Sequence, residues 1–163
     1  MPSSCDRWRT SLATPEQWVT GVAGRDFVAT SKRSAGFAAD WIKAWIGMDV
    51  EWLRKRLARD FVQISPFGRL EGRENYLETV APVARKSVQE LKFKELIAGR
   101  NQAVIWFGNP TPAGVRPACE WVRVENGLIV EIQSFCDSAT VREVLSSCEQ
   151  ENLGKSSRTP FDD

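Results

Sequence analysis

The period of the hydrophobic pattern changes near Val88, and this change limits the folds open to the chain. Before Val88, apolar residues recur mainly at steps of three and four, as they do on a helix with one buried face. From Val88 onward, apolar and polar residues tend to alternate, which is typical of strands with one buried face. Because the helices and most strands lie in separate parts of the chain, the pattern predicts an α+β domain with an antiparallel sheet.

The first part of the chain predicts one short helix and three longer ones. The short helix should begin at Thr14-Pro15, with Thr as the cap and Pro at the first helical position. Pro82 should kink the last helix, because it removes a backbone donor. We expect the longer helices at about residues 34–46, at about residues 50–59, and from residue 72 onward.

One short strand and a four-stranded meander complete the predicted fold. Asn126-Gly127 is a strong hairpin signal, since both residues tolerate positive φ. A curved, cone-shaped sheet with three helices on its concave face would enclose a hydrophobic pocket between the layers. We expect the short strand at residues 61–64 and the meander strands at about 91–97, 103–107, 118–124 and 128–136.

A length of 163 residues suits one domain. We predict an N-terminal leader with the short helix over residues 1–33, the α+β domain over 34–147, and a disordered polar tail over 148–163. The seven Trp and eight Phe residues either line a roomy apolar pocket or fill the core.

Charge and composition argue against several classes of partner. The net charge is +1 with both signs interspersed, so we expect no nucleic acid partner. No apolar run approaches a membrane span, and the first residues do not resemble a signal peptide. A basic cluster on the second long helix is interpreted as a solvated helix face; it comprises Arg54, Lys55, Arg56 and Arg59.

Cysteine and histidine usage narrows the chemistry. The sequence has no histidine, so Asp, Glu, Tyr, Cys, Lys or water must carry any proton transfer. The cysteines form no CxxC pair, so we expect no metal site and no cofactor, and a reducing cytoplasm fits best. The four cysteines are Cys5, Cys119, Cys136 and Cys148.

Three stretches resemble the superfamily of SnoaL-like cyclases and ketosteroid isomerase, whose fold is called nuclear-transport-factor-2-like. The stretch from Phe37 to Gly68 is similar to the start of ketosteroid isomerase without a gap, and it ends Asp-Phe-Val-Gln-Ile-Ser-Pro-Phe-Gly. Gly72-Arg73-Glu74 resembles the start of the third helix. The stretch from Glu120 to Gly127 looks like the penultimate strand and its hairpin.

The resemblance implies a set of candidate catalytic residues. Trp41 stands where the isomerase has a Tyr donor, and Ser65 stands where it has an Asp base. Glu120 stands where it has a proton-bearing Asp and keeps the carboxyl group. Ser134 occupies the position of an Asp in SnoaL-like cyclases. The candidate catalytic residues are therefore Glu120, Trp41 and Ser65.

The hydrophobic periodicity indicates which side chains face the predicted pocket. Alternation places Glu120 with an apolar set, so it should face the pocket; a slip of one residue would instead pair it with Arg123 or Lys94 on the outside. Trp41 either donates a hydrogen bond to Glu120 or a substrate, or only packs in the core. The candidate substrate-binding residues are Trp45, Tyr76, Trp106, Val122 and Ser134.

Two functions remain open at this level. The first is a cofactor-independent isomerase, cyclase or dehydratase that acts on a hydrophobic polyketide- or terpenoid-like substrate by proton transfer. The second is a non-catalytic module that binds a ligand or another protein. The resemblance also implies a homodimer formed through the sheet face, which an exposed apolar row would support.

Overall fold

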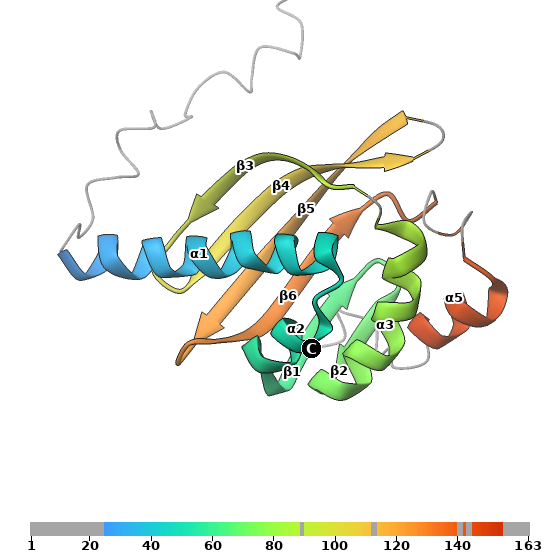
Figure 1. Cartoon of the computed structure of the whole chain (residues 1–163), viewed down its shortest axis with the longest axis horizontal. Helices are drawn as coiled ribbons and strands as arrows, with labels where there is room; N and C mark the ends of the chain where they lie inside the picture. The colour runs from blue at the N-terminus through green and yellow to red at the C-terminus, as the bar shows by residue number, and fades with distance from the viewer. Residues whose placement is uncertain (1–24, 89, 112–113, 140–141, 143–144, 155–163) are drawn as a thin grey trace, which may run out of the picture.

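The computed structural model describes residues 25–88, 90–111, 114–139, 142 and 145–154. The chain runs from blue to red along its elements in Figure 1. In chain order these are α1 (Arg25–Gly47), α2 (Val50–Arg56), β1 (Leu57–Ser65), β2 (Gly68–Glu71), α3 (Arg73–Ser87), β3 (Lys92–Ala98), β4 (Gln102–Thr111), β5 (Gly114–Glu125), β6 (Leu128–Cys136) and α5 (Ser147–Gly154).

The strands form one curved sheet with the order β2-β1-β6-β5-β4-β3. The four strands from β3 to β6 pair as the predicted antiparallel meander. The sheet is not wholly antiparallel, however, because β1 runs parallel to β6. A parallel pair needs a long connection, and α3 with the first meander strands supplies it here. The sequence analysis also missed β2, which pairs with β1 across the tight Ser65–Gly68 turn.

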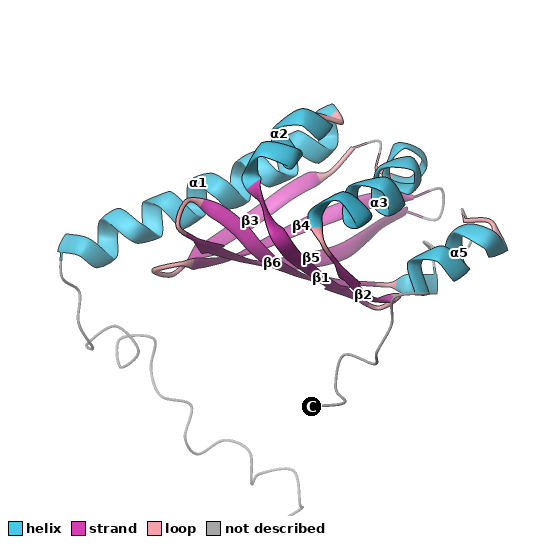
Figure 2. Cartoon of the chain, turned by 90° about the horizontal axis from the view of Figure 1, so that it is seen from below, coloured by secondary structure: helices cyan, strands magenta, loops and turns pink. Residues whose placement is uncertain are grey.

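Helices α1, α2 and α3 lie on the same face of the sheet, as Figure 2 shows. Helix α1 crosses β3, β4 and β5, while α3 lies against β1 and β2. The core fills the space between these helices and the concave side of the sheet. Its largest fully buried side chains include Trp41, Tyr76, Phe61, Leu53 and Leu57. The predicted α+β class and curved sheet are therefore confirmed.

Helix boundaries differ from the predicted ones at two places. Helix α1 begins at Arg25, nine residues before the expected start at Ser34, so residue 33 is inside a helix. Helix α2 ends at Arg56, because Leu57 takes an extended conformation and starts β1. The helix predicted from Thr14 to Gly24 lies outside the described residues.

The polar tail predicted from residue 148 contains a helix. Helix α5 covers Ser147–Gly154, and its Leu153 is buried. Lys86 of α3 pairs with Glu149 of α5 at 2.5 Å. The tail has few apolar residues, so only a tertiary contact could reveal this helix. Residues 155–163 lie outside the described residues.

We expect acid to loosen α5. The Lys86 and Ser146 hydrogen bonds lower the pKa of Glu149 from 4.5 to about 2. A lowered pKa in the folded state stabilises the fold above pH 4.5, and this contribution is lost as the pH falls toward 2. In that window the protection factors of the amides over 149–153 should fall in the native chain, measured relative to the intrinsic exchange rate at each pH. The Glu149→Gln variant should lose this pH dependence, and an identical dependence in both chains would contradict the assignment.

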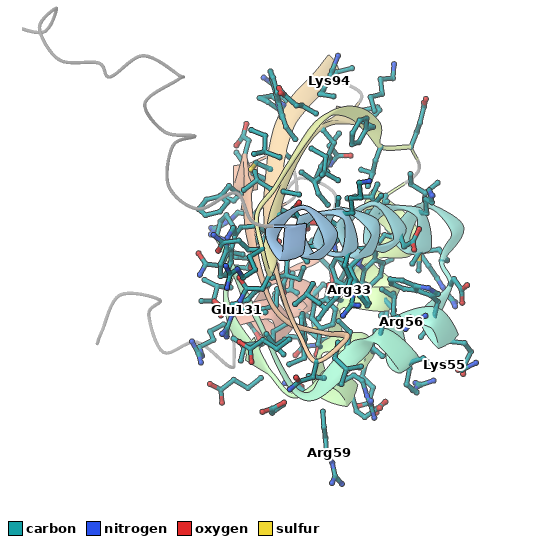
Figure 3. The ribbon with its side chains drawn as sticks, turned by 90° about the vertical axis from the view of Figure 1, so that its left-hand side faces the viewer. Arg33, Lys55, Arg56, Arg59, Lys94 and Glu131 are labelled. Carbon is teal, nitrogen blue, oxygen red and sulfur yellow. The ribbon has the colours of Figure 1, made fainter. Side chains whose placement is uncertain are left out.

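The hairpin prediction is confirmed, and the basic cluster is largely solvated as predicted but lies only partly on a helix. Asn126 and Gly127 both have positive φ, 51° and 79°, as the hairpin requires. Strand β6 has the predicted bounds. Lys55, Arg56 and Arg59 are exposed, as Figure 3 shows, although Arg59 lies in β1. Arg54 pairs with Glu51 and Glu74 at 2.6 and 3.1 Å.

No helix in the described part of the chain is long and apolar enough to cross a membrane. Cys119, Cys136 and Cys148 are free thiols.

Candidate functional site

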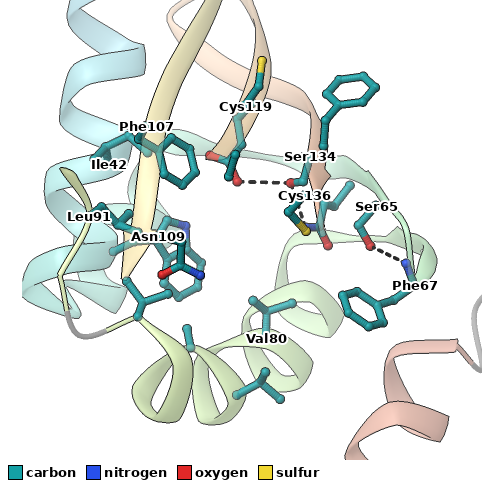
Figure 4. Close-up of a pocket in the computed structure, with 18 of the residues that line it drawn as sticks. Ile42, Ser65, Phe67, Val80, Leu91, Phe107, Asn109, Cys119, Ser134 and Cys136 are labelled. Carbon is teal, nitrogen blue, oxygen red and sulfur yellow. Dashed lines mark hydrogen bonds between the residues drawn. The ribbon is translucent and has the colours of Figure 1, made fainter. Parts of the chain in front are cut away.

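A cavity of about 170 Å³ lies between the concave side of the sheet and helices α1 and α3. Its wall is mostly apolar, with Phe67, Phe107, Val80 and Leu91 among the side chains seen in Figure 4. The volume is similar to that of protein cavities that hold a benzene-sized molecule. The polar residues in the wall are Gln63, Ser65, Asn109, Glu120 and Ser134.

Glu120 faces this cavity, as predicted from alternation. In β5 it pairs with Ile105 of β4 and with Ser134 of β6. Its neighbours on the same face, Ala118 and Val122, are both buried. The outward alternative does not occur. Arg123 pairs instead with Glu125 and Glu131 on the other face, at 2.6 and 2.9 Å.

Two hydrogen bonds hold the Glu120 carboxyl group. The Trp41 indole N–H donates to Oε2 at 2.6 Å. The Ser134 hydroxyl donates to Oε1 at 3.1 Å, and the Gln63 amide donates to Ser134 at 3.4 Å. An indole nitrogen can only donate, so Oε2 must remain an acceptor. A serine hydroxyl can turn and accept instead, so Oε1 is the oxygen that can gain and lose a proton.

Burial raises the pKa of Glu120 above its ordinary value of 4.5. The hydrogen bonds from Trp41 and Ser134 act in the opposite direction, because they stabilise the carboxylate. Burial is the larger effect. A carboxyl group with a raised pKa in a cavity wall can act as a general acid or base closer to neutral pH than an exposed one.

Trp41 combines the two roles that the sequence left open. It is fully buried and lies behind the cavity wall, packed in a cluster with Trp45, Phe61 and Tyr76. The Trp41 and Tyr76 rings stack with centroids 6.2 Å apart. The indole N–H reaches Glu120 from this core side, so the aromatic cluster fixes the position of the carboxyl group.

Trp45 and Tyr76 line the cavity as predicted. Tyr76 is fully buried, and its ring packs edge-on against Trp45 with centroids 6.0 Å apart. Burial and the negative charge of Glu120 raise the pKa of Tyr76 well above 10. Its phenol therefore stays neutral at physiological pH.

Ser65 lines the cavity, but its hydroxyl is engaged by the backbone of the β1–β2 turn. It accepts from the Phe67 N–H at 3.2 Å and donates to the Gly68 carbonyl at 3.4 Å. Figure 4 shows the bond to Phe67. Such hydroxyl-to-backbone bonds are typical of turns. These two bonds give Ser65 a structural role in the turn, and its predicted catalytic role stays a prediction.

Two of the predicted binding residues do not line the cavity. Trp106 is 49% exposed on the outer face of the sheet, because its neighbours Ile105 and Phe107 point inward. The uninterrupted apolar run from Ala103 to Phe107 concealed this alternation. Val122 is on the inner face with Glu120 but is completely buried in the core. Phe107 takes the place that Trp106 was expected to fill.

Sequence reasoning missed Gln63 and Asn109, which both line the cavity. Gln63 is two residues before Ser65 on β1, so alternation along that strand could have identified it. Asn109 lies beyond the end of the strand predicted at residues 103–107. In the structure β4 continues to Thr111, and Asn109 remains on the inner face.

The curved α+β sheet and its largely apolar cavity define the class of fold. The sequence profile of the SnoaL-like domain family matches residues 38–132, more than half of the chain. The chain therefore belongs to the SnoaL-like domain family, which confirms the resemblance seen in the sequence. Among curated proteins, no sequence matches the chain.

Several solved structures share the fold. A protein from Kribbella flavida superposes with a TM-score of 0.63 at 21% identity, over 70% of this chain and 94% of its own. A putative SnoaL-like polyketide cyclase from a Jannaschia species gives 0.60 at 14% identity, over 72% and 94% of the two chains. A putative ketosteroid isomerase from Kribbella flavida gives 0.57 at 17% identity, over 66% and 79%. At these identities the similarity establishes the fold alone.

Proposed function

We propose that this protein is a small-molecule isomerase, cyclase or dehydratase that acts on a hydrophobic substrate by proton transfer at Glu120. The observation that carries the proposal is a partly buried carboxyl group in the wall of an apolar cavity, held by Trp41 and Ser134. A fixed carboxyl group with a raised pKa is suited to general acid–base catalysis. The apolar wall of the cavity suits a polyketide- or terpenoid-like substrate, and its volume of about 170 Å³ holds about one ring of such a molecule.

The minimal reaction step uses only Glu120 and a carbonyl substrate. Oε1 removes a proton from the carbon next to the carbonyl, and the electron pair of that C–H bond passes into an enolate. The same oxygen then returns the proton to that carbon or to another carbon of the conjugated system. Each turnover leaves Glu120 in its starting state, so the step requires no other reactant.

Hydrogen exchange at carbon tests this step without knowledge of the final product. The protein should catalyse deuterium uptake next to the carbonyl of uncharged apolar ketones such as 2-tetralone and β-ionone in deuterated buffer, measured by proton NMR. The rate should rise with pH as Glu120 ionises, with a midpoint above 4.5. Exchange no faster than in buffer, for ketones that bind saturably, would contradict the proposal.

A non-catalytic ligand-binding module is the second candidate. It is favoured by Ser65, which stands where the isomerases have a carboxylate and is bonded to its own turn. Glu120 is then the single carboxyl group among the cavity-lining residues. A binding module would hold the same ketones without exchanging their protons.

We also propose that the protein forms a homodimer through the outer face of its sheet. Trp106, Cys119 and Phe135 lie in one row across β4, β5 and β6. Trp106 and Phe135 are 49% and 56% exposed, which is unusual for large apolar side chains. Sedimentation equilibrium should give twice the chain mass, and Trp106→Lys should shift the protein to the monomer.

A further inference from the structure

We infer that the side-chain amide of Asn109 is a second binding point in the cavity and that it takes the hydroxyl group of an uncharged, elongated apolar ligand. The inference deepens the proposed function, on which it rests for the role of Glu120. The contact at Asn109 itself does not depend on whether Glu120 moves a proton.

The strand register places Asn109 on the inner face of the sheet at a distance from Glu120. Glu120 pairs with Ile105 of β4, and Asn109 is four residues further along the same strand. Residues 105, 107 and 109 share one face, because side chains alternate along a strand. At about 3.3 Å per residue, Asn109 is about 13 Å along the strand from Ile105, the residue opposite Glu120. Figure 4 shows Asn109 beside Phe107 on the cavity side of β4.

The side-chain amide of Asn109 carries a buried, unsatisfied polar atom. Its Oδ1 atom is buried and has no hydrogen-bond partner among the described residues. Almost all buried polar atoms in native proteins have a partner, so such an atom requires an explanation. Asn109 also lines the cavity, so a bound hydroxyl group can reach this acceptor once the side chain turns Oδ1 toward the cavity.

The wall between the two polar points is apolar, which defines the body of the ligand. Phe107 and Ala118 form the cross-strand pair between Glu120 and Asn109, and both are buried. A ligand that spans the two points must therefore be apolar in its middle. A polar group there would lose its bonds to water without gaining others.

The charges around the cavity favour an uncharged ligand. No Lys or Arg is among the described residues that line it, while Glu120 contributes negative charge when ionised. An anionic group would be repelled and would have no cation to pair with inside. Arg116 pairs with Asn109 across the strands, but it is exposed and is not part of the wall.

Four probes of the same shape test the inference by calorimetric titration at pH 7. They are 4-propylphenol, which can donate, 4-propylanisole, which can only accept, 4-propyltoluene, which can do neither, and 4-propylbenzoate, which is an anion. The native chain should bind the phenol about three- to ten-fold more tightly than the toluene or the anisole, the value of one hydrogen bond. It should bind the benzoate most weakly.

The Asn109→Leu variant should remove this preference and leave the affinity for 4-propyltoluene equal or higher. Asn109→Val removes the same amide with a side chain that suits a strand, in case the leucine variant does not fold. Asn75→Leu is the matched control, since Asn75 is exposed on α3 away from the cavity wall.

The inference is overturned if the ratio of phenol to toluene affinity is the same in the native chain and in the Asn109 variants. It is also overturned if the native chain binds the benzoate more tightly than the phenol, or if it shows no saturable binding of the phenol. Glu120→Gln separates this test from that of the proposed function. If that variant keeps full proton exchange, the catalytic role fails while the Asn109 contact stands.

Discussion

Replacing Glu120 with glutamine should lower the rate of carbonyl-adjacent proton exchange by about 10²–10⁴-fold, the usual contribution of one general acid–base group. An amide cannot accept and return a proton at neutral pH, whereas it can keep the carboxyl group's contacts. The glutamine oxygen can accept from Trp41, and its NH₂ group can donate to Ser134, whose hydroxyl turns to accept. The measurement is the exchange rate at saturating ketone.

The same substitution should not weaken the fold at neutral pH. The folded-state pKa of Glu120 is raised, so the folded chain binds the proton more tightly than the unfolded chain does. Native stability should therefore decline as pH rises from 4.5 through the raised pKa, and the decline is complete above it. Glutamine carries no charge to bury, so Glu120→Gln should remove this decline.

Glu78→Gln provides the matched control, because Glu78 is exposed on α3 and is not part of the cavity wall. It should change neither exchange nor stability measurably. Loss of activity in Glu120→Gln together with loss of native structure would show that the carboxyl group is needed for folding. Retention of full exchange by a folded variant would exclude Glu120 as the proton-transfer group.

Replacing Trp41 with phenylalanine should give the second large effect, a loss of about 2–4 kcal/mol in the free energy of unfolding. One part comes from the smaller ring in a fully buried site. The other part comes from Oε2 of Glu120, which loses the hydrogen bond from the Trp41 indole. Urea denaturation followed by circular dichroism measures the total.

Trp41→Phe should also raise the pKa of Glu120 further, because the lost hydrogen bond stabilised the carboxylate. Carboxyl-carbon NMR of Glu120 should detect the increase, and the acid limb of the exchange profile should move to higher pH with it. Trp121→Phe is the control. The Trp121 indole donates to Gln102 at an exposed position, so its loss should cost less than about 1 kcal/mol. An unchanged pKa in Trp41→Phe would contradict the assigned contact.

The hydrophobic periodicity predicted most of the helices and strands, because the formation of each element depends mainly on residues close to one another in the sequence. Strand β6 and the Asn126-Gly127 hairpin follow from alternation and from turn chemistry within a few residues. The apolar stripe that carries Trp41 predicted the C-terminal part of α1. Alternation with Ala118 and Val122 also predicted that Glu120 faces inward. The resemblance to SnoaL-like proteins added the order of the layers, which the family match confirms.

The site depended on contacts that no local pattern contains. Trp41 and Glu120 are 79 residues apart, and only the packing of α1 across β5 brings them within 2.6 Å. Trp106 faces outward because β4 has a fixed register with β5, whereas the apolar run around it fits either face. Asn109 reaches the cavity because β4 extends to Thr111 alongside β5. Short-range periodicity thus determined which elements form, and the tertiary structure decided which side chains meet, because burial and register arise only when distant elements pack.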